Sequence, residues 1–240
     1  MFEKAYTGAD GFAIMAGISF FSAFTLAVII AYFHHISIKT LKKCIIITIV
    51  PVTIMGKVMF YFSSKTFPSS IMSFFAGGGF VFYGGLIGLI IGIIISSKVY
   101  DQDFHRIMNC LAIPVLVAQA LGRLGCYFNG CCYGKAYSGI GAVIHQDIYV
   151  YPTQFMESLI CVIISIVLLF FPFDYRYILY CLFYGICRFI IELFRGDDVR
   201  GHFGLLSTSQ WISIAFIAYG LRGIYLKNKR EKSLVRNTKM

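Results

Sequence analysis

Charge is what this sequence has least of. Only 13% of its 240 residues are Asp, Glu, Lys or Arg, whereas about a quarter is usual for a soluble domain. Hydrophobic residues make up 58% of the chain. Phe and Tyr, whose rings favour the edges of a bilayer, are abundant. The shortage of charge therefore excludes an ordinary soluble domain and predicts an integral membrane protein.

Other features are missing as well. No polar linker is long enough to separate domains and no internal repeat is visible, so we expect a single domain over residues 1–240. The opening "MFEKAYTGADGF" lacks the layout of a signal peptide, and we expect the first apolar run to stay in the membrane. Eight cysteines are too few and too scattered for a secreted disulfide scaffold. Five are predicted to be small core residues: Cys44, Cys110, Cys161, Cys181 and Cys187.

The apolar residues fall into runs of the length that a membrane requires. A spanning helix needs about 20 mostly apolar residues. Seven stretches fit: 11–33, 44–62, 76–97, 106–124, 154–173, 177–195 and 204–225. The predicted fold class is an all-α integral membrane bundle of about seven transmembrane helices.

The basic residues indicate the topology. A net charge of +10 could suit nucleic acid, but these residues lie at the ends of apolar runs and in the C-terminal tail, which excludes that partner. With the N-terminus outside, thirteen Lys and Arg lie inside and eight outside. Because cytoplasmic segments carry the excess of Lys and Arg, we expect a cytoplasmic C-terminus. Residues 126–153 are then the longest outer loop.

The sixth predicted span carries ionisable residues, which are costly in a membrane and indicate function. Tyr184, Arg188 and Glu192 are spaced by four residues, and Arg195 follows three later. This spacing places them on one helix face. One interpretation is an inward face that holds an anion, with Glu192 orienting an arginine. The alternative is an Arg188–Glu192 pair that only joins helices.

Arg123 lies at the predicted end of the fourth span, between Gly122 and Gly125. The two glycines let backbone and ligand approach closely. A guanidinium fork suits two phosphate oxygens better than an ammonium group does. Since Arg123 and Arg188 both fall near the outer membrane edge, they predict a site for a phospholipid headgroup. In the alternative, Arg123 only extends to the interface.

The third span contains a stripe of glycines at Gly84, Gly88 and Gly92, which predicts close helix packing. Residues 77–79, three further glycines, are expected to break that helix and to place Tyr83 in a cavity.

The fifth span is expected to start at Pro152, since proline is tolerated in a first helical turn. Gln154 and Glu157 then share one face, and helix capping is an adequate account of both.

Three cysteines in "GRLGCYFNGCCYGK" leave several interpretations open. Cys126, Cys131 and Cys132 could bind zinc with His145 as a distant fourth ligand, but they supply only one half of a usual structural site. A Cys126–Cys131 disulfide is feasible outside the cytoplasm. Reduced cysteines that line a tight turn are favoured. We expect no metal and no cofactor.

Five segments occur in an order that carries a family resemblance: "GGGFVFYGGLIG", "GRLGCYFNGCCYG", "YPTQFMES", "LFYGICRFIIELFR" and "GLLSTSQWISI". The second resembles the signature Gly-Arg-x-Gly-Asn-Phe-x-Asn-Gly-Glu-x-x-Gly of prolipoprotein diacylglyceryl transferases. The fourth resembles that family's Tyr-Gly-x-x-Arg-x-x-x-Glu-x-x-Arg segment. The chain is therefore similar to this family through most of its length.

The resemblance implies a seven-span fold with the N-terminus outside and an enzyme of lipoprotein biosynthesis. It implies transfer of the diacylglyceryl group of phosphatidylglycerol to the lipobox cysteine thiol of a prolipoprotein. The implied partners are phosphatidylglycerol, prolipoprotein signal peptides with a lipobox cysteine, and the bilayer. The implied location is the bacterial plasma (inner) membrane, with the active site toward the extracytoplasmic leaflet.

The resemblance also implies residue roles. Arg123 and Arg188 would hold the phosphate and stabilise the charge on the leaving group, with Tyr184 and Tyr83 as further catalytic residues. The remaining lipid-binding residues would be Asn129, Gly122, Gly125, Glu192, Arg195, Gly84 and Gly85. Pocket residues would be Cys126, Cys131, Tyr151 and Gln154.

The chain departs from the family pattern at four positions. Tyr83 stands where the family has a histidine before Gly-Gly, and Tyr151 replaces another histidine. Cys126 and Cys131 replace the signature asparagine and glutamate. Two alternatives follow: a related transferase that uses another acceptor, and a phospholipid-binding or transport protein without chemistry.

Overall fold

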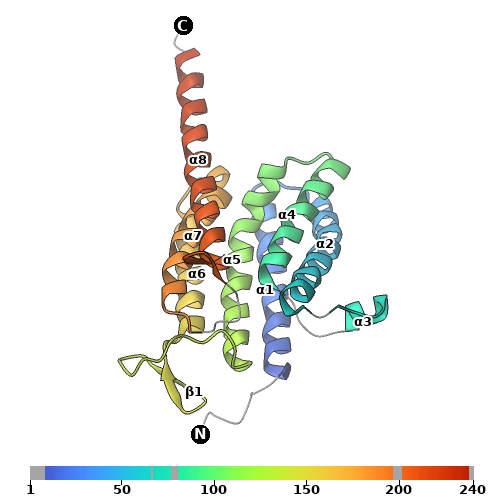
Figure 1. The fold of residues 1–240 in the computed structure, drawn as a ribbon. Coiled ribbons are helices and arrows are strands. Elements are labelled where there is room, and N and C mark those ends of the chain that lie inside the picture. The colour runs from blue at the N-terminus through green and yellow to red at the C-terminus, as the bar shows by residue number, and fades with distance from the viewer. Residues whose placement is uncertain (1–8, 66, 77–80, 197–201, 238–240) are drawn as a thin grey trace. The chain divides into compact units, whose positions relative to one another are not determined.

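The computed structural model describes residues 9–65, 67–76, 81–196 and 202–237. These residues form α-helices joined by short segments and two small hairpins (Figure 1). The helices are α1 (Ala9–Phe33), α2 (Ile38–Ser64), α3 (Ile71–Ala76), α4 (Phe82–Val99), α5 (Phe104–Phe128), α6 (Thr153–Leu169), α7 (Arg176–Leu193) and α8 (Thr208–Asn237). The strands are β1 (Val143–His145), β2 (Ile148–Val150), β3 (His202–Phe203) and β4 (Leu206–Ser207), paired β1–β2 and β3–β4 in antiparallel fashion.

Several helices have the length and composition of membrane spans. Among the described residues, Gly11–Phe33, Ile38–Phe62 and Phe104–Phe128 are long and apolar enough to cross a bilayer. Tyr83–Val99 and Thr153–Leu169 are shorter apolar helices. This supports the predicted all-α membrane class, while the count of seven spans stays a prediction.

Some predicted helix edges are wrong. The last helix begins at Thr208 rather than at residue 204, because Gly204 (φ +66°) takes a left-handed conformation in the turn between β3 and β4. The third predicted span, 76–97, contains the end of α3 and the start of α4 at Phe82. The glycines at 77–79, predicted to break that helix, lie outside the described residues.

The chain divides into two compact units, and α1 and α5 contribute to both. The smaller unit, Val28–Cys110, is built on the pair α2 and α4 (Figure 1). A Cβ on Gly84 or Gly88 would overlap the carbonyl oxygen of Met55 or Pro51, respectively. A Cβ on Gly92 would lie 2.7 Å from the Cα of Thr48. The predicted packing role of the glycine stripe is therefore confirmed.

We expect Gly88→Ala to destabilise the protein by about 1–3 kcal/mol, because the added methyl group forces α2 and α4 apart. Thermal unfolding of purified protein in detergent measures the effect. Gly17→Ala in α1 is the matched control, since no described atom lies within 4 Å of the position of its Cβ. Unchanged unfolding temperatures in both variants would contradict this account of the helix pair.

The larger unit comprises Met1–Ala27 and Leu111–Met240. Within it α7 packs between α6 and α8 (Figure 1). Two glycines make the α7–α8 contact close: a Cβ on Gly185 would lie 3.0 Å from the Ser213 carbonyl oxygen, and one on Gly220 would lie 2.8 Å from the Leu182 Cβ. This tight helix pair positions the ionisable residues described next.

Candidate functional site

Arg123 lies inside α5 rather than at its end, because the helix continues to Phe128. Gly125 lies in the last turn of α5 and packs closely on α1, since an added Cβ would lie 3.2 Å from the Met15 Cβ. The side chain of Arg123 is only 10% exposed. A buried guanidinium requires partners of opposite charge, and α6 supplies one.

Glu157, on α6, is the centre of the site. One carboxylate oxygen pairs with Arg123 Nη2 at 2.8 Å and accepts a hydrogen bond from the Tyr184 hydroxyl at 2.9 Å. The other carboxylate oxygen lies 3.5 Å from Arg188 Nη1. Glu157 is 1% exposed. Helix capping does not account for these contacts, so Glu157 is added to the predicted site residues. The sequence held one signal for it, a carboxylate within an apolar run.

The ionisable face of α7 exists as its spacing predicts, and it is extended by α8. Arg188 Nη2 pairs with Glu192 Oε2 at 2.6 Å and donates to the Ser209 hydroxyl at 3.2 Å. Ser207 donates to Glu192 Oε1 at 2.9 Å. Arg195 follows the end of α7, and its Nε lies 3.9 Å from Glu192 Oε2. Both serines are contacts that the sequence prediction did not include.

The described ion pairs of this group join three guanidinium groups to two carboxylates. The arginine cluster, as we call it, consists of Arg123, Arg188, Arg195, Glu157 and Glu192. The arginines are between 2% and 9% exposed. Guanidinium groups gathered in one place form charge-assisted hydrogen bonds to phosphate or carboxylate oxygens. The cluster is therefore suited to hold an anion.

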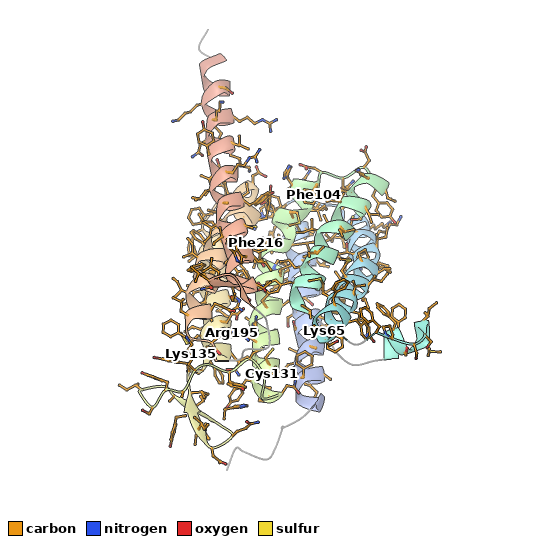
Figure 2. The ribbon with its side chains drawn as sticks, in the orientation of Figure 1. Lys65, Phe104, Cys131, Lys135, Arg195 and Phe216 are labelled. Carbon is orange, nitrogen blue, oxygen red and sulfur yellow. The ribbon has the colours of Figure 1, made fainter. Side chains whose placement is uncertain are left out.

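The segment after α5 docks on the end of α7. Gly134 forms an antiparallel bridge with Arg195, and the Lys135 N–H donates to the Phe194 carbonyl at 2.9 Å. A Cβ on Gly134 would lie 2.5 Å from the Tyr151 Cβ, so only glycine allows this approach. Figure 2 shows Lys135 and Cys131 in this segment, with Arg195 at the end of α7. The segment between α5 and α6 thus reaches the arginine cluster.

The start of α6 holds the cysteine-containing turn. Helix α6 begins at Thr153, one residue after the predicted start, and Pro152 is its N-cap residue. Its Thr153 hydroxyl donates to the Cys132 carbonyl at 2.8 Å, and Gln154 Nε2 donates to the Cys131 carbonyl at 2.8 Å. The structure therefore brings Gln154 to the cysteines, as the predicted pocket requires.

The three thiols of the turn gather together. The Sγ atoms of Cys126, Cys131 and Cys132 all lie within 4.8 Å of one another. Hydrogen bonds from Cys126 and Cys131 hold the pKa of the Cys132 thiol below its ordinary value. Arg123 and Arg195 lower this pKa further, because cations favour the thiolate. The thiols therefore border the arginine cluster.

The other predicted site residues lie at varied distances from this centre. The Asn129 side chain hydrogen-bonds the Cys131 thiol. The Tyr151 ring stacks on Tyr137 with ring centroids 3.9 Å apart. No described atom lies within 4 Å of the position of a Cβ on Gly122, which leaves open space beside Arg123.

Three predicted residues belong to the smaller unit: Tyr83, Gly84 and Gly85. The packing of Gly84 on α2 accounts for that glycine without a ligand. The roles of all three in the site stay predictions.

The fold and the site define a helical membrane protein with a buried cluster of arginines and glutamates. A family model described as "Prolipoprotein diacylglyceryl transferase" matches residues 9–226. The chain belongs to this family, as the sequence motifs predicted, and with it the predicted enzyme class, a transferase, is confirmed.

Similar proteins carry a consistent name. A Clostridium perfringens protein is 35% identical over 199 residues, 76% of each chain, and a Clostridium tetani protein is 34% identical over 157 residues, 60% of this chain and 63% of that one. A Finegoldia magna protein is 26% identical over 238 residues, 94% of this chain and 93% of its own. All three are named phosphatidylglycerol–prolipoprotein diacylglyceryl transferase, the Clostridium perfringens protein with the added number 2.

Proposed function

We propose that this protein transfers the diacylglyceryl group of phosphatidylglycerol to a cysteine thiol of prolipoproteins. The observation that carries the proposal is the buried cluster of three arginines, in a chain of the diacylglyceryl transferase family. The phosphodiester of phosphatidylglycerol carries a negative charge and oxygen acceptors of the kind that guanidinium groups bind. The names of the relatives support the same donor and acceptor.

In the proposed reaction, the thiolate sulfur attacks the carbon of the diacylglyceryl group that is bonded to a phosphate oxygen. A carbon–sulfur bond forms while the carbon–oxygen bond breaks, and glycerol phosphate leaves with the electron pair. Negative charge grows on the departing phosphate, where the guanidinium groups of Arg123 and Arg188 stabilise it. Donors fixed in a buried site before the reaction are effective because they need no reorganisation. Glu157 positions both arginines by pairing with each of them.

The other site residues serve the headgroup. Tyr184 and Asn129 position it, while Glu192 and Arg195 organise the adjoining face. The open space at Gly122 admits the lipid beside Arg123. The remaining lipid-binding residues of the proposal are Gly125, Gly84 and Gly85, with Tyr83 as a catalytic residue and Tyr151 in the pocket.

The proposal includes the placement in the membrane. Both units form one transmembrane domain of seven spans with the N-terminus outside, since the family match crosses both units and Lys and Arg are in excess on the proposed inner side. The arginine cluster then faces the extracytoplasmic leaflet of a bacterial plasma (inner) membrane. There it meets both phosphatidylglycerol and the lipobox cysteine of prolipoprotein signal peptides.

The test is a transfer assay with purified protein in phosphatidylglycerol vesicles and a lipobox peptide. We expect mass spectrometry to detect a diacylglyceryl adduct on the peptide cysteine. Arg188→Ala should reduce its rate by about 100-fold or more, because a preorganised donor is lost. Arg222→Ala, which alters an exposed arginine of α8, is the control and should leave the rate unchanged. No adduct from folded protein would overturn the proposed function, and released glycerol phosphate without adduct would indicate another acceptor.

A further inference from the structure

We propose that Cys126, Cys131 and Cys132 bind a thiophilic divalent cation, zinc, whose open fourth position binds the acceptor thiol. This inference rests on the proposed function and adds to it the group that activates the nucleophile. It departs from our expectation from the sequence that no metal is bound, because spacing alone did not show that the three thiols converge.

The sulfur atoms have the separation that such a site needs. Zinc–sulfur bonds are about 2.3 Å long, so three sulfur ligands of one zinc ion lie about 4 Å apart. The Sγ atoms of the turn lie within 4.8 Å of one another. Small rotations of the cysteine side chains, which move each sulfur atom by about 1 Å or less, would therefore bring all three within bonding distance of one zinc ion.

The backbone that carries these thiols is held in place. Helix α5 closes with a hydrogen bond from the Cys131 N–H to the Cys126 carbonyl, 3.1 Å long. Cys132 adopts a left-handed conformation (φ +66°), which is uncommon outside glycine and persists where the surroundings impose it. Thr153 and Gln154 impose it here through their hydrogen bonds to the two carbonyls of the turn. The turn therefore presents a preformed set of three sulfur atoms.

The fourth coordination position remains available to a substrate. All three cysteines are only half-buried, so a ligand can reach them. His145, the fourth candidate from the sequence, stacks on the Tyr133 ring with centroids 4.0 Å apart, and it does not belong to the group of converging ligand atoms. Three protein ligands with one open position are typical of catalytic rather than structural zinc.

The charge and location of the site suit this role. A zinc ion with three thiolates carries one negative charge, and Arg123 and Arg195 lie close enough to interact electrostatically with Cys132. The metal site is thereby near Arg123, one of the two arginines that we assign to the donor phosphate. A nucleophile bound there would be adjacent to the carbon that it attacks.

The chemistry explains why such a site is useful. A free thiol has a pKa of about 8.5 and is mostly protonated at neutral pH, whereas a thiol that coordinates zinc is deprotonated. In the proposed step the acceptor thiol displaces water from zinc and its proton passes to solvent. The sulfur then forms the bond to the lipid carbon as glycerol phosphate leaves. The neutral thioether is a weak ligand, and water replaces it on the metal.

Titration of metal-free, reduced protein with Co²⁺ is the first test. We expect one equivalent to produce sulfur-to-cobalt charge-transfer absorption and visible bands of tetrahedral cobalt, both abolished by one equivalent of Zn²⁺. Addition of a lipobox peptide should shift the visible bands, whereas its Cys→Ser analogue should not. Absence of tight cobalt binding to fully reduced protein would overturn the proposal, as would a disulfide among the three cysteines in protein purified without reductant.

Matched variants identify the ligands. Cys131→Ser and Cys132→Ser should each weaken Zn²⁺ binding at least 100-fold, and using both guards against a folding defect in either one. Cys181→Ser, which removes a half-buried thiol on α7, should bind Zn²⁺ like the wild type. Equal binding by all three variants would contradict the assignment.

A transfer assay separates this inference from the proposed function. Chelation of the metal should slow adduct formation at least 10-fold, and Zn²⁺ should restore it. Full transfer by metal-free protein would overturn the metal site and leave the proposed function intact. The opposite outcome is tight Zn²⁺ binding with the peptide-induced spectral shift but no transfer. It would contradict the proposed function and support the metal site.

Discussion

Replacement of Glu157 by glutamine is expected to reduce both stability and transfer. The carboxylate pairs with Arg123 and Arg188 and accepts a hydrogen bond from Tyr184, and glutamine keeps its shape without its charge. Loss of one partner from a buried ion pair costs about 3–5 kcal/mol. Transfer should fall about 100-fold, because a small misplacement of the two arginines weakens their hold on the phosphate. Thermal unfolding and the vesicle assay measure the two effects.

Glu231→Gln is the matched control for this experiment. Glu231 is an exposed carboxylate near the C-terminus that accepts a hydrogen bond from the Tyr175 hydroxyl at 2.7 Å, and this hydrogen bond raises the pKa of Tyr175. Its loss should change stability by less than about 1 kcal/mol and leave transfer unchanged. If Glu157→Gln behaved like Glu231→Gln, Glu157 would not be the centre of the site.

The second large effect is expected at Arg123. Arg123→Ala should lower the turnover number about 100- to 1,000-fold, the loss that follows removal of one fixed donor to a developing negative charge. Arg123→Lys should recover only part of this loss, because an ammonium group lacks the planar fork that matches two phosphate oxygens. Initial rates of adduct formation at saturating lipid in mixed micelles measure both variants.

An arginine outside the site provides the comparison. Arg106 is exposed and donates to the His34 and His35 carbonyls of the smaller unit, so Arg106→Ala should leave the turnover number unchanged. A full rate in Arg123→Lys would show that charge alone suffices. An unchanged rate in Arg123→Ala would remove this residue from the reaction.

Local patterns predicted the parts of this protein that local physics determines. Runs of apolar residues predicted the helices, and the spacing of Gly84, Gly88 and Gly92 predicted their packing on α2. The four-residue spacing predicted that Tyr184, Arg188 and Glu192 share one face of α7. Each of these patterns is a regular spacing of residues within one helix, so it can be read from the sequence alone.

Contacts between distant segments could not be predicted in the same way. The pairing of Glu157 with Arg123 joins residues on α5 and α6 that are 34 positions apart in the sequence, and no local period reveals it. The convergence of Cys126, Cys131 and Cys132 depends on a left-handed residue and on hydrogen bonds from α6. The end of α5 was predicted too early, since the packing of Gly125 on α1 stabilises a turn that its helix propensity disfavours.

The central claim is that the arginine cluster binds the phosphate of the donor lipid. The most direct measurement is native mass spectrometry of protein released from micelles that contain equal amounts of phosphatidylglycerol and diacylglycerol. Wild-type protein should retain phosphatidylglycerol in preference to diacylglycerol. The double variant Arg123→Ala with Arg188→Ala should lose this preference while remaining folded. Equal preference for phosphatidylglycerol in both proteins would contradict the claim and place the donor phosphate elsewhere.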